Sequence, residues 1–133
     1  NLFESIVGLS EKQFSSALYM SEKDIIDLHS RGFTIGSHSS SHPWLNTLSA
    51  WEQQKEIMSS VEALTELCGP SNDWIMCYPF GAYNDETIDI FKNNNFSLGL
   101  TTEFNSANLM VHDRFKLPRL DTNDFYPSSS VIH

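Results

Sequence analysis

The sequence predicts an α/β domain in which parallel strands alternate with outer helices. Stretches with apolar residues at helical spacing, each opened by a capping residue, alternate along the chain with short apolar or β-branched runs. The steps from helix to strand are short, and such an order is typical of parallel sheets covered by helices. With 133 residues, the chain forms one domain at most.

The first helix is expected to begin after Ser21 and to end at Gly32. Ser21 is a preferred N-cap residue, and a glycine after a basic last turn is a common helix end. The buried side of this helix would consist of Ile25, Ile26 and Leu28. β-Branched and aromatic residues follow, so residues 33–37 are expected to form a strand. Residues 1–20 show no convincing period, and we expect them to be irregular.

The second helix is expected from Ser49 to about Leu67. Ser49 and Glu52 form a capping box, and a Gly-Pro pair at residues 69–70 ends the helix. The continuous apolar run over residues 74–78 is the signature of a strand buried on both faces.

The rest of the chain is expected to add one helix and two strands. Asn84 would cap the helix. A strand over residues 96–100 would carry Thr101 and Thr102 at its tip, and a surface loop would follow. The last strand, over residues 115–120, would lie at a sheet edge because it contains a proline.

The charge of the chain argues against two classes of partner. Its 17 acidic and 8 basic side chains give a formal charge of −9, whereas nucleic acids and anionic membranes bind basic surfaces. No apolar run approaches the length of a transmembrane helix, and the first residues lack a signal-peptide pattern. Cys68 and Cys77 stand in apolar contexts and are expected to be buried free thiols, which leaves the cellular compartment open.

Two histidines are the strongest candidates for a functional site. His38 and His42 stand four residues apart in a Ser-rich loop after the predicted strand. Pro43 disfavours a helical conformation at His42, and the small residues between the histidines would let the loop curl until both rings converge. Neutral imidazole is a common ligand of zinc. Taken alone, the spacing also fits two polar loop histidines without a function.

Three other distinctive segments follow predicted strands, namely residues 78–81, Thr101–Thr102 and residues 119–121. The carboxyl ends of parallel strands meet at one edge of a sheet, where binding and catalytic residues gather. We therefore expect these segments to lie beside the histidine loop, which favours a functional role for the two histidines.

From about residue 21 to 122 the chain resembles the polysaccharide deacetylases, carbohydrate esterase family 4, also called the NodB-homology domain. Residues 32–43, Gly-Phe-Thr-Ile-Gly-Ser-His-Ser-Ser-Ser-His-Pro, resemble the motif in which both histidines bind a divalent metal, usually zinc. Residues 48–69 resemble the segment that follows it. Residues 78–84, Tyr-Pro-Phe-Gly-Ala-Tyr-Asn, resemble the third motif in its poly-N-acetylglucosamine deacetylase form, and residues 117–120, Leu-Pro-Arg-Leu, resemble the fourth.

The resemblance implies part of a distorted (β/α) barrel with a metal, most often zinc, at its strand ends. It also implies a hydrolase that removes N-acetyl groups from an N-acetylated polysaccharide. His38 and His42 would bind the metal. The backbone N–H of Phe80 would stabilise the oxyanion.

The resemblance also implies roles for residues around the metal. Residues 78–80, which are Tyr78, Pro79 and Phe80, would contact the sugar. Arg119 would orient a catalytic carboxylate, whereas its residue context alone indicates a strand-end arginine paired with Asp121 or Asp124. Trp44 could line the groove or only pack the loop.

One motif of the family has no match. The opening Thr-Phe-Asp-Asp-Gly supplies the general base and the third metal ligand, but the only aspartates before His38 are Asp24 and Asp27, in the predicted helix. We therefore expect either an N-terminally incomplete domain or a catalytically inactive carbohydrate-binding or structural remnant. In the first case, a missing N-terminal segment or an oligomer partner would cover the open sheet edge. Residues 130–133 faintly resemble the closing motif, but His133 falls in a tail that is expected to be frayed.

Overall fold

The computed structural model describes residues 2–121. The chain divides into two compact units, Asn1–Ile35 and Gly36–His133. The candidate site residues numbered from 38 to 121 belong to the second unit, whereas Asp124 and the tail with His133 lie outside the described residues.

The first unit contains three helices, α1 (Leu2–Val7), α2 (Glu11–Leu18) and α3 (Glu22–Ser30). α3 begins at its predicted N-cap, Ser21, and the predicted capping box is present. Its expected buried side is only partly covered, because Ile26 is exposed.

The expectation that residues 1–20 are irregular is wrong, because α1 and α2 occupy most of them. The missed signal is a second capping box: Ser10 accepts a hydrogen bond from the N–H of Gln13, and the Gln13 side chain bonds back to the N–H of Ser10. Helices this short show little periodicity, so only their caps mark them in the sequence.

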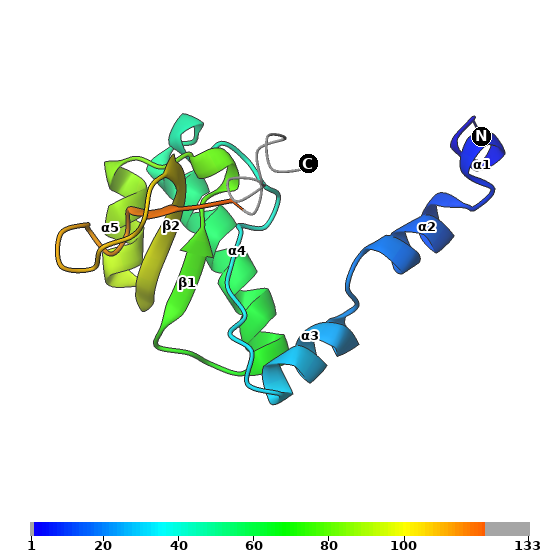
Figure 1. Cartoon of the computed structure of the whole chain (residues 1–133), viewed down its shortest axis with the longest axis horizontal. Helices are drawn as coiled ribbons and strands as arrows, with labels where there is room; N and C mark the ends of the chain where they lie inside the picture. The colour runs from blue at the N-terminus through cyan, green and yellow to red at the C-terminus, as the bar shows by residue number, and fades with distance from the viewer. Residues whose placement is uncertain (1, 122–133) are drawn as a thin grey trace, which may run out of the picture. The chain divides into compact units, whose positions relative to one another are not determined.

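The second unit is built on a parallel sheet in the order β1 (Trp74–Cys77), β2 (Phe96–Phe104) and β3 (Leu117–Arg119), as the helix–strand alternation predicts. Figure 1 shows β1 and β2 side by side, with α4 and α5 next to them. β2 is longer than expected, because it continues beside β3 until Phe104 pairs with Arg119. Thr101 and Thr102 therefore lie within the strand instead of at its tip.

The predicted strand over residues 33–37 is reduced to a single parallel bridge between Ser37 and Met76. Ser37 donates its N–H to the carbonyl of Ile75 and accepts the N–H of Cys77, at 2.8 and 2.9 Å. β1 has only four residues, so little of the preceding segment finds a partner, although the β propensity of residues 33–35 is high.

Helices α4 (Ala50–Cys68) and α5 (Asp85–Asn93) pack with one face of the sheet, and both begin at their predicted caps. Ile57 and Val61 of α4 and Phe91 of α5 share one core with Trp74 and Met76 of β1. The alternate residues of β1, at positions 75 and 77, are only half-buried. The prediction of a strand buried on both faces therefore holds for one face of β1.

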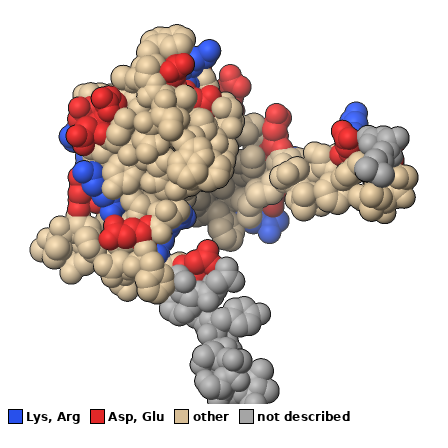
Figure 2. Space-filling model, turned by 90° about the horizontal axis from the view of Figure 1, so that it is seen from above, with Lys and Arg blue, Asp and Glu red and all other residues tan. Residues whose placement is uncertain are grey.

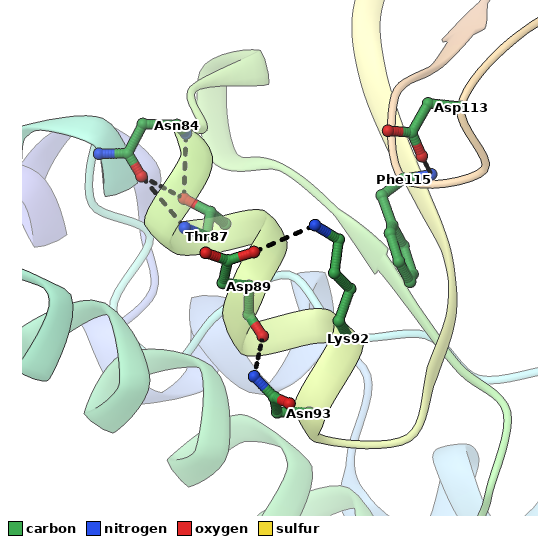
Figure 3. Close-up of polar contacts among 7 residues, drawn as sticks. All are labelled: Asn84, Thr87, Asp89, Lys92, Asn93, Asp113 and Phe115. Carbon is green, nitrogen blue, oxygen red and sulfur yellow. Dashed lines mark hydrogen bonds and ion pairs between the residues drawn. The ribbon is translucent and has the colours of Figure 1, made fainter.

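The start of α5 is tied to α4 by a buried polar cluster. Asn84 caps the helix by accepting the N–H of Thr87 at 3.1 Å, and Thr87 Oγ1 accepts the N–H of Asn84 in return, as Figure 3 shows. Gln53 of α4 is fully buried and donates to Asn84 Oδ1. Since buried polar groups are costly unless they are hydrogen-bonded, this cluster fixes how the two helices meet.

The surface fits the acidic composition of the chain. On the face shown in Figure 2, acidic side chains are scattered among neutral ones, and basic side chains occur in small groups. Cys68 and Cys77 are free, as predicted, but half-buried. Of the helices in residues 2–121, none has the length and apolar character needed to cross a membrane.

Tyr78 links the sheet to the loop before β3. Its ring is 1% exposed, and its hydroxyl donates a hydrogen bond of 2.7 Å to the carbonyl oxygen of Phe115. The hydroxyl fits because position 99 is a glycine, where an added Cβ would overlap it. Burial raises the pKa of Tyr78 far above its ordinary value, so the hydroxyl stays protonated and remains a donor.

We predict that Tyr78→Phe lowers the free energy of unfolding by about 1–3 kcal/mol, because the buried carbonyl of Phe115 loses its partner. Urea denaturation followed by circular dichroism measures this change. Tyr83→Phe is the control, since its half-buried hydroxyl forms no hydrogen bond within residues 2–121 and should matter little. Equal stability of the wild type and Tyr78→Phe would contradict the assignment.

Candidate functional site

The two candidate histidines lie together at the carboxyl end of β1. The ring centroids of His38 and His42 are 4.6 Å apart, with an angle of 65° between the ring planes. Both residues are exposed. The loop therefore brings the two imidazoles into contact without burying them, as a site open to a ligand requires.

A backbone carbonyl orients His38. Its Nδ1 lies 2.7 Å from the carbonyl oxygen of Cys77 at the end of β1. A carbonyl oxygen can only accept, so Nδ1 carries the hydrogen, and the lone pair of the neutral ring lies on Nε2. This is the arrangement by which metal-binding histidines are usually oriented.

The backbone between the histidines is strained. Ser39 and His42 both have positive φ angles, of 63° and 59°. Pro43 disfavours the right-handed helical region at His42, and His42 lies outside that region. The hydroxyl oxygen of Ser39 accepts the N–H of His42 at 3.1 Å and so closes the turn.

An aromatic pair adjoins the histidines. The Phe80 ring contacts His42 edge-on, with centroids 4.5 Å apart, and stacks on Trp44 at 4.6 Å with an angle of 6° between the planes. Phe80 is 49% exposed and Trp44 is 53% exposed. The sequence left open whether Trp44 lines a groove or packs the loop, and in the structure it packs on Phe80 while keeping half of its surface exposed.

The other residues predicted to contact the sugar lie elsewhere. Tyr78 and Pro79 are almost completely buried in the second unit. Tyr78 is the N-cap of a short 3-10 helix, Pro79–Gly81, and Pro79 is the first residue of that helix. Their buried side chains therefore anchor the turn that carries Phe80. Of the three, only Phe80 presents its side chain at the surface.

Arg119 lies at the end of β3, on the same edge of the sheet. Its Nε donates to the carbonyl oxygen of Thr101 at 2.7 Å, and one terminal nitrogen lies 3.7 Å from Cys77 Sγ. It lines a cavity of about 280 Å³ together with Thr102, Phe104, Leu120 and Asp121. Asp121, one of the two acidic partners that the residue context suggests, thus shares the cavity with Arg119.

The structure brings the four predicted strand-end segments together. His38 contacts Cys77, His42 contacts Phe80, and Arg119 joins β1 and β2 through its two bonds. The turn at residues 79–81 also packs closely on β2, because a Cβ added to Gly81 would overlap the hydroxyl of Thr102. The sheet edge therefore carries all four segments, as the strand order indicates.

The carboxylate expected as a third ligand is not found beside the histidines. Within residues 2–121, no group of three or more His, Cys, Asp or Glu side chains has the geometry to hold a metal ion. The donors at this edge are two imidazoles, one of them with its Nε2 lone pair available. This set fits two of the three protein ligands of a catalytic zinc site.

The polysaccharide deacetylase family model matches residues 10–99, which is more than half of the chain. The chain belongs to the polysaccharide deacetylase family. The matched residues include both histidines and the turn at 79–81, whereas Arg119 lies beyond them. The wider range of resemblance predicted from the sequence, residues 21–122, remains a prediction on its C-terminal side.

Two relatives illustrate the similarity. The chain is 29% identical over 89 residues to YxkH of Bacillus subtilis (strain 168), whose name assigns it provisionally to the polysaccharide deacetylases. That match covers 67% of this chain and 32% of YxkH. The structure of the Streptococcus pyogenes deacetylase PplD in complex with acetate superposes with a TM-score of 0.72 and 27% identity, over 81% of this chain and 47% of PplD.

These matches confirm the predicted fold class. The parallel sheet with its outer helices is part of a distorted (β/α) barrel of the deacetylase type. The chain spans less than half the length of either relative.

We predict that Gly81→Ala destabilises the chain by more than about 1 kcal/mol, because φ at this position is +70° and the new Cβ would meet Thr102. Thermal unfolding measures the change. Thr102→Ala in the same chain should restore part of the loss, since it removes the colliding atoms. No rescue in the double variant would contradict the close packing of this turn on β2.

Proposed function

We propose that this chain carries the two-histidine part of the active site of a metal-dependent deacetylase that removes N-acetyl groups from N-acetylglucosamine-type polysaccharides. The observation that carries the proposal is the convergence of His38 and His42, with Nδ1 of His38 bound to the Cys77 carbonyl and Nε2 left for a ligand. Family membership supports the reaction class, and the acetate in PplD is the small product that such a reaction releases.

The two imidazoles fit part of the ligand set of a divalent metal, most simply zinc. His38 and His42 would hold it, and a carboxylate from outside residues 2–121 would complete the ligands. Bound there, the metal would polarise the amide carbonyl and lower the pKa of a bound water.

Residues of this chain would then serve the hydrolysis in three ways. The backbone N–H of Phe80, whose ring contacts His42, would donate to the carbonyl oxygen as negative charge develops on it. The exposed faces of Phe80 and Trp44 would receive the apolar C–H surface of a sugar. Arg119, held by the Thr101 carbonyl, would orient the carboxylate that acts as general base.

A second candidate function is favoured by one observation. Because residues 2–121 contain no group of three His, Cys, Asp or Glu side chains placed to hold a metal ion, the chain would also suit a carbohydrate-binding module that does not catalyse the reaction. Under this alternative, Phe80 and Trp44 would still contact a sugar, but a metal bound at the histidines would not catalyse a reaction.

We predict that His38→Ala and His42→Ala each weaken zinc binding at least about tenfold, because each removes one ligand. Competition with a chromophoric chelator gives the affinity, and acetate release from an N-acetylglucosamine oligomer reports the reaction. Acetate release by the zinc-loaded wild type would contradict the binding module, whereas zinc binding without release fits an active site that lacks its third ligand. Unchanged zinc binding by the double histidine variant would contradict the metal site.

We also predict that Trp44→Ala raises the dissociation constant for an N-acetylglucosamine oligomer about tenfold, or about 1.4 kcal/mol, because the aromatic pair loses one of its two rings. Isothermal titration calorimetry measures the constant. Trp51→Ala is the matched control, since Trp51 is 71% exposed on α4 and takes no part in the pair. Equal losses for both variants would contradict a specific platform.

A further inference from the structure

We propose that Glu56 is the positioning residue of the histidine loop. Its carboxylate on α4 clamps Ser41, which lies between His38 and His42, and thereby holds the two imidazoles in the arrangement that binds the metal. This inference rests on the proposed metal site.

The clamp consists of two hydrogen bonds from one residue. The backbone N–H of Ser41 donates to Glu56 Oε2 at 2.9 Å, and the Ser41 hydroxyl donates to Glu56 Oε1 at 2.8 Å. Hydrogen bonds to an ionised acceptor are stronger than neutral ones, and a paired set fixes orientation as well as position. Both oxygens of Glu56 thus face the loop, so the residue acts through Ser41.

The loop needs such support because its own bonds are few. Ser39 and His42, on either side of the clamped segment, both hold positive φ angles that non-glycine residues avoid. Within the loop, the Ser39 hydroxyl accepts the N–H of His42. Strained backbone persists where the surroundings over-determine it, and Ser41 is the point where α4 reaches this loop.

The helix that bears the clamp is well suited to hold the loop. One turn after Glu56, Ser60 gives its hydroxyl hydrogen to the carbonyl of Ile57, so Ser37 must be the donor in the 2.6 Å contact between the Ser37 and Ser60 hydroxyls. Ser60 and Glu56, which lie on one face of α4, thus bind Ser37 before His38 and Ser41 after it. Ile57, which follows Glu56, is fully buried in the core and anchors this part of the helix.

The carboxylate is specific to this position on the helix. Glu62 and Glu66, further along α4, are exposed, and within the described residues neither carboxylate forms a hydrogen bond or ion pair with the histidine loop. Replacing Glu62 therefore changes the charge of the helix by the same amount as replacing Glu56 and leaves the loop untouched.

The test measures zinc affinity and the visible absorption spectrum of the Co²⁺-loaded chain for the wild type and variants. We expect Glu56→Gln, which keeps only one acceptor oxygen, and Glu56→Ala to weaken zinc binding about 10- to 100-fold, as for other groups that orient metal ligands. The Co²⁺ bands should change in position or intensity. Glu62→Gln should match the wild type in both measurements.

A double-mutant cycle separates positioning from general destabilisation. Ser41→Ala removes one of the two bonds, and in the Glu56→Ala background it should cost nothing further, because the clamp is already lost. Far-UV circular dichroism checks that the variants fold, and Glu56→Gln decides the question if Glu56→Ala does not fold.

Wild-type zinc affinity and Co²⁺ bands in Glu56→Gln or Glu56→Ala, together with loss of zinc in His38→Ala and His42→Ala, would overturn the positioning role and leave the metal site standing. Additive effects of Ser41→Ala and Glu56→Ala would also overturn it. Zinc binding that does not depend on His38 and His42 would instead overturn the proposed function.

Discussion

The candidate site depends on the two hydrogen bonds that join Ser37 to β1. They set the register in which His38 follows the edge of the sheet, so that its Nδ1 meets the carbonyl of Cys77, one residue beyond the bridge partner Met76. Parallel pairing then places Leu100 of β2 beside Cys77, the last residue of β1, and β3 adds Arg119 on the same edge. The chemistry of the edge is thus a consequence of strand register.

A large part of this arrangement could be predicted from the sequence. Ser21, Ser49 and Asn84 mark their helices by side-chain caps that act within one turn, so the local pattern is sufficient. The apolar runs mark β1 and β2, and the rule that parallel strands end at one edge indicates that His38, Phe80 and Arg119 gather there. Short-range chemistry and one topological rule therefore account for most of the site.

What the sequence could not indicate depends on tertiary partners. Tyr78 and Phe80 are two residues apart in one motif, yet burial against Phe115 takes Tyr78 into the core while a positive φ turns Phe80 outward to His42 and Trp44. Likewise, residues 33–36 have the composition of a strand but pair with no strand among the described residues. In the sequence Glu56 is an ordinary helix carboxylate, and only the fold brings it beside Ser41. Each of these outcomes is decided by a neighbour distant in sequence.

The proposed metal site is tested most directly by locating a bound metal in crystals. Crystals of the chain soaked with zinc should show one anomalous peak at the zinc edge, about 2.0–2.1 Å from His38 Nε2 and from a ring nitrogen of His42. Nδ1 of His38 should remain bonded to the Cys77 carbonyl in those crystals. A peak on Nδ1, or zinc bound only at sites away from both histidines, would contradict the account.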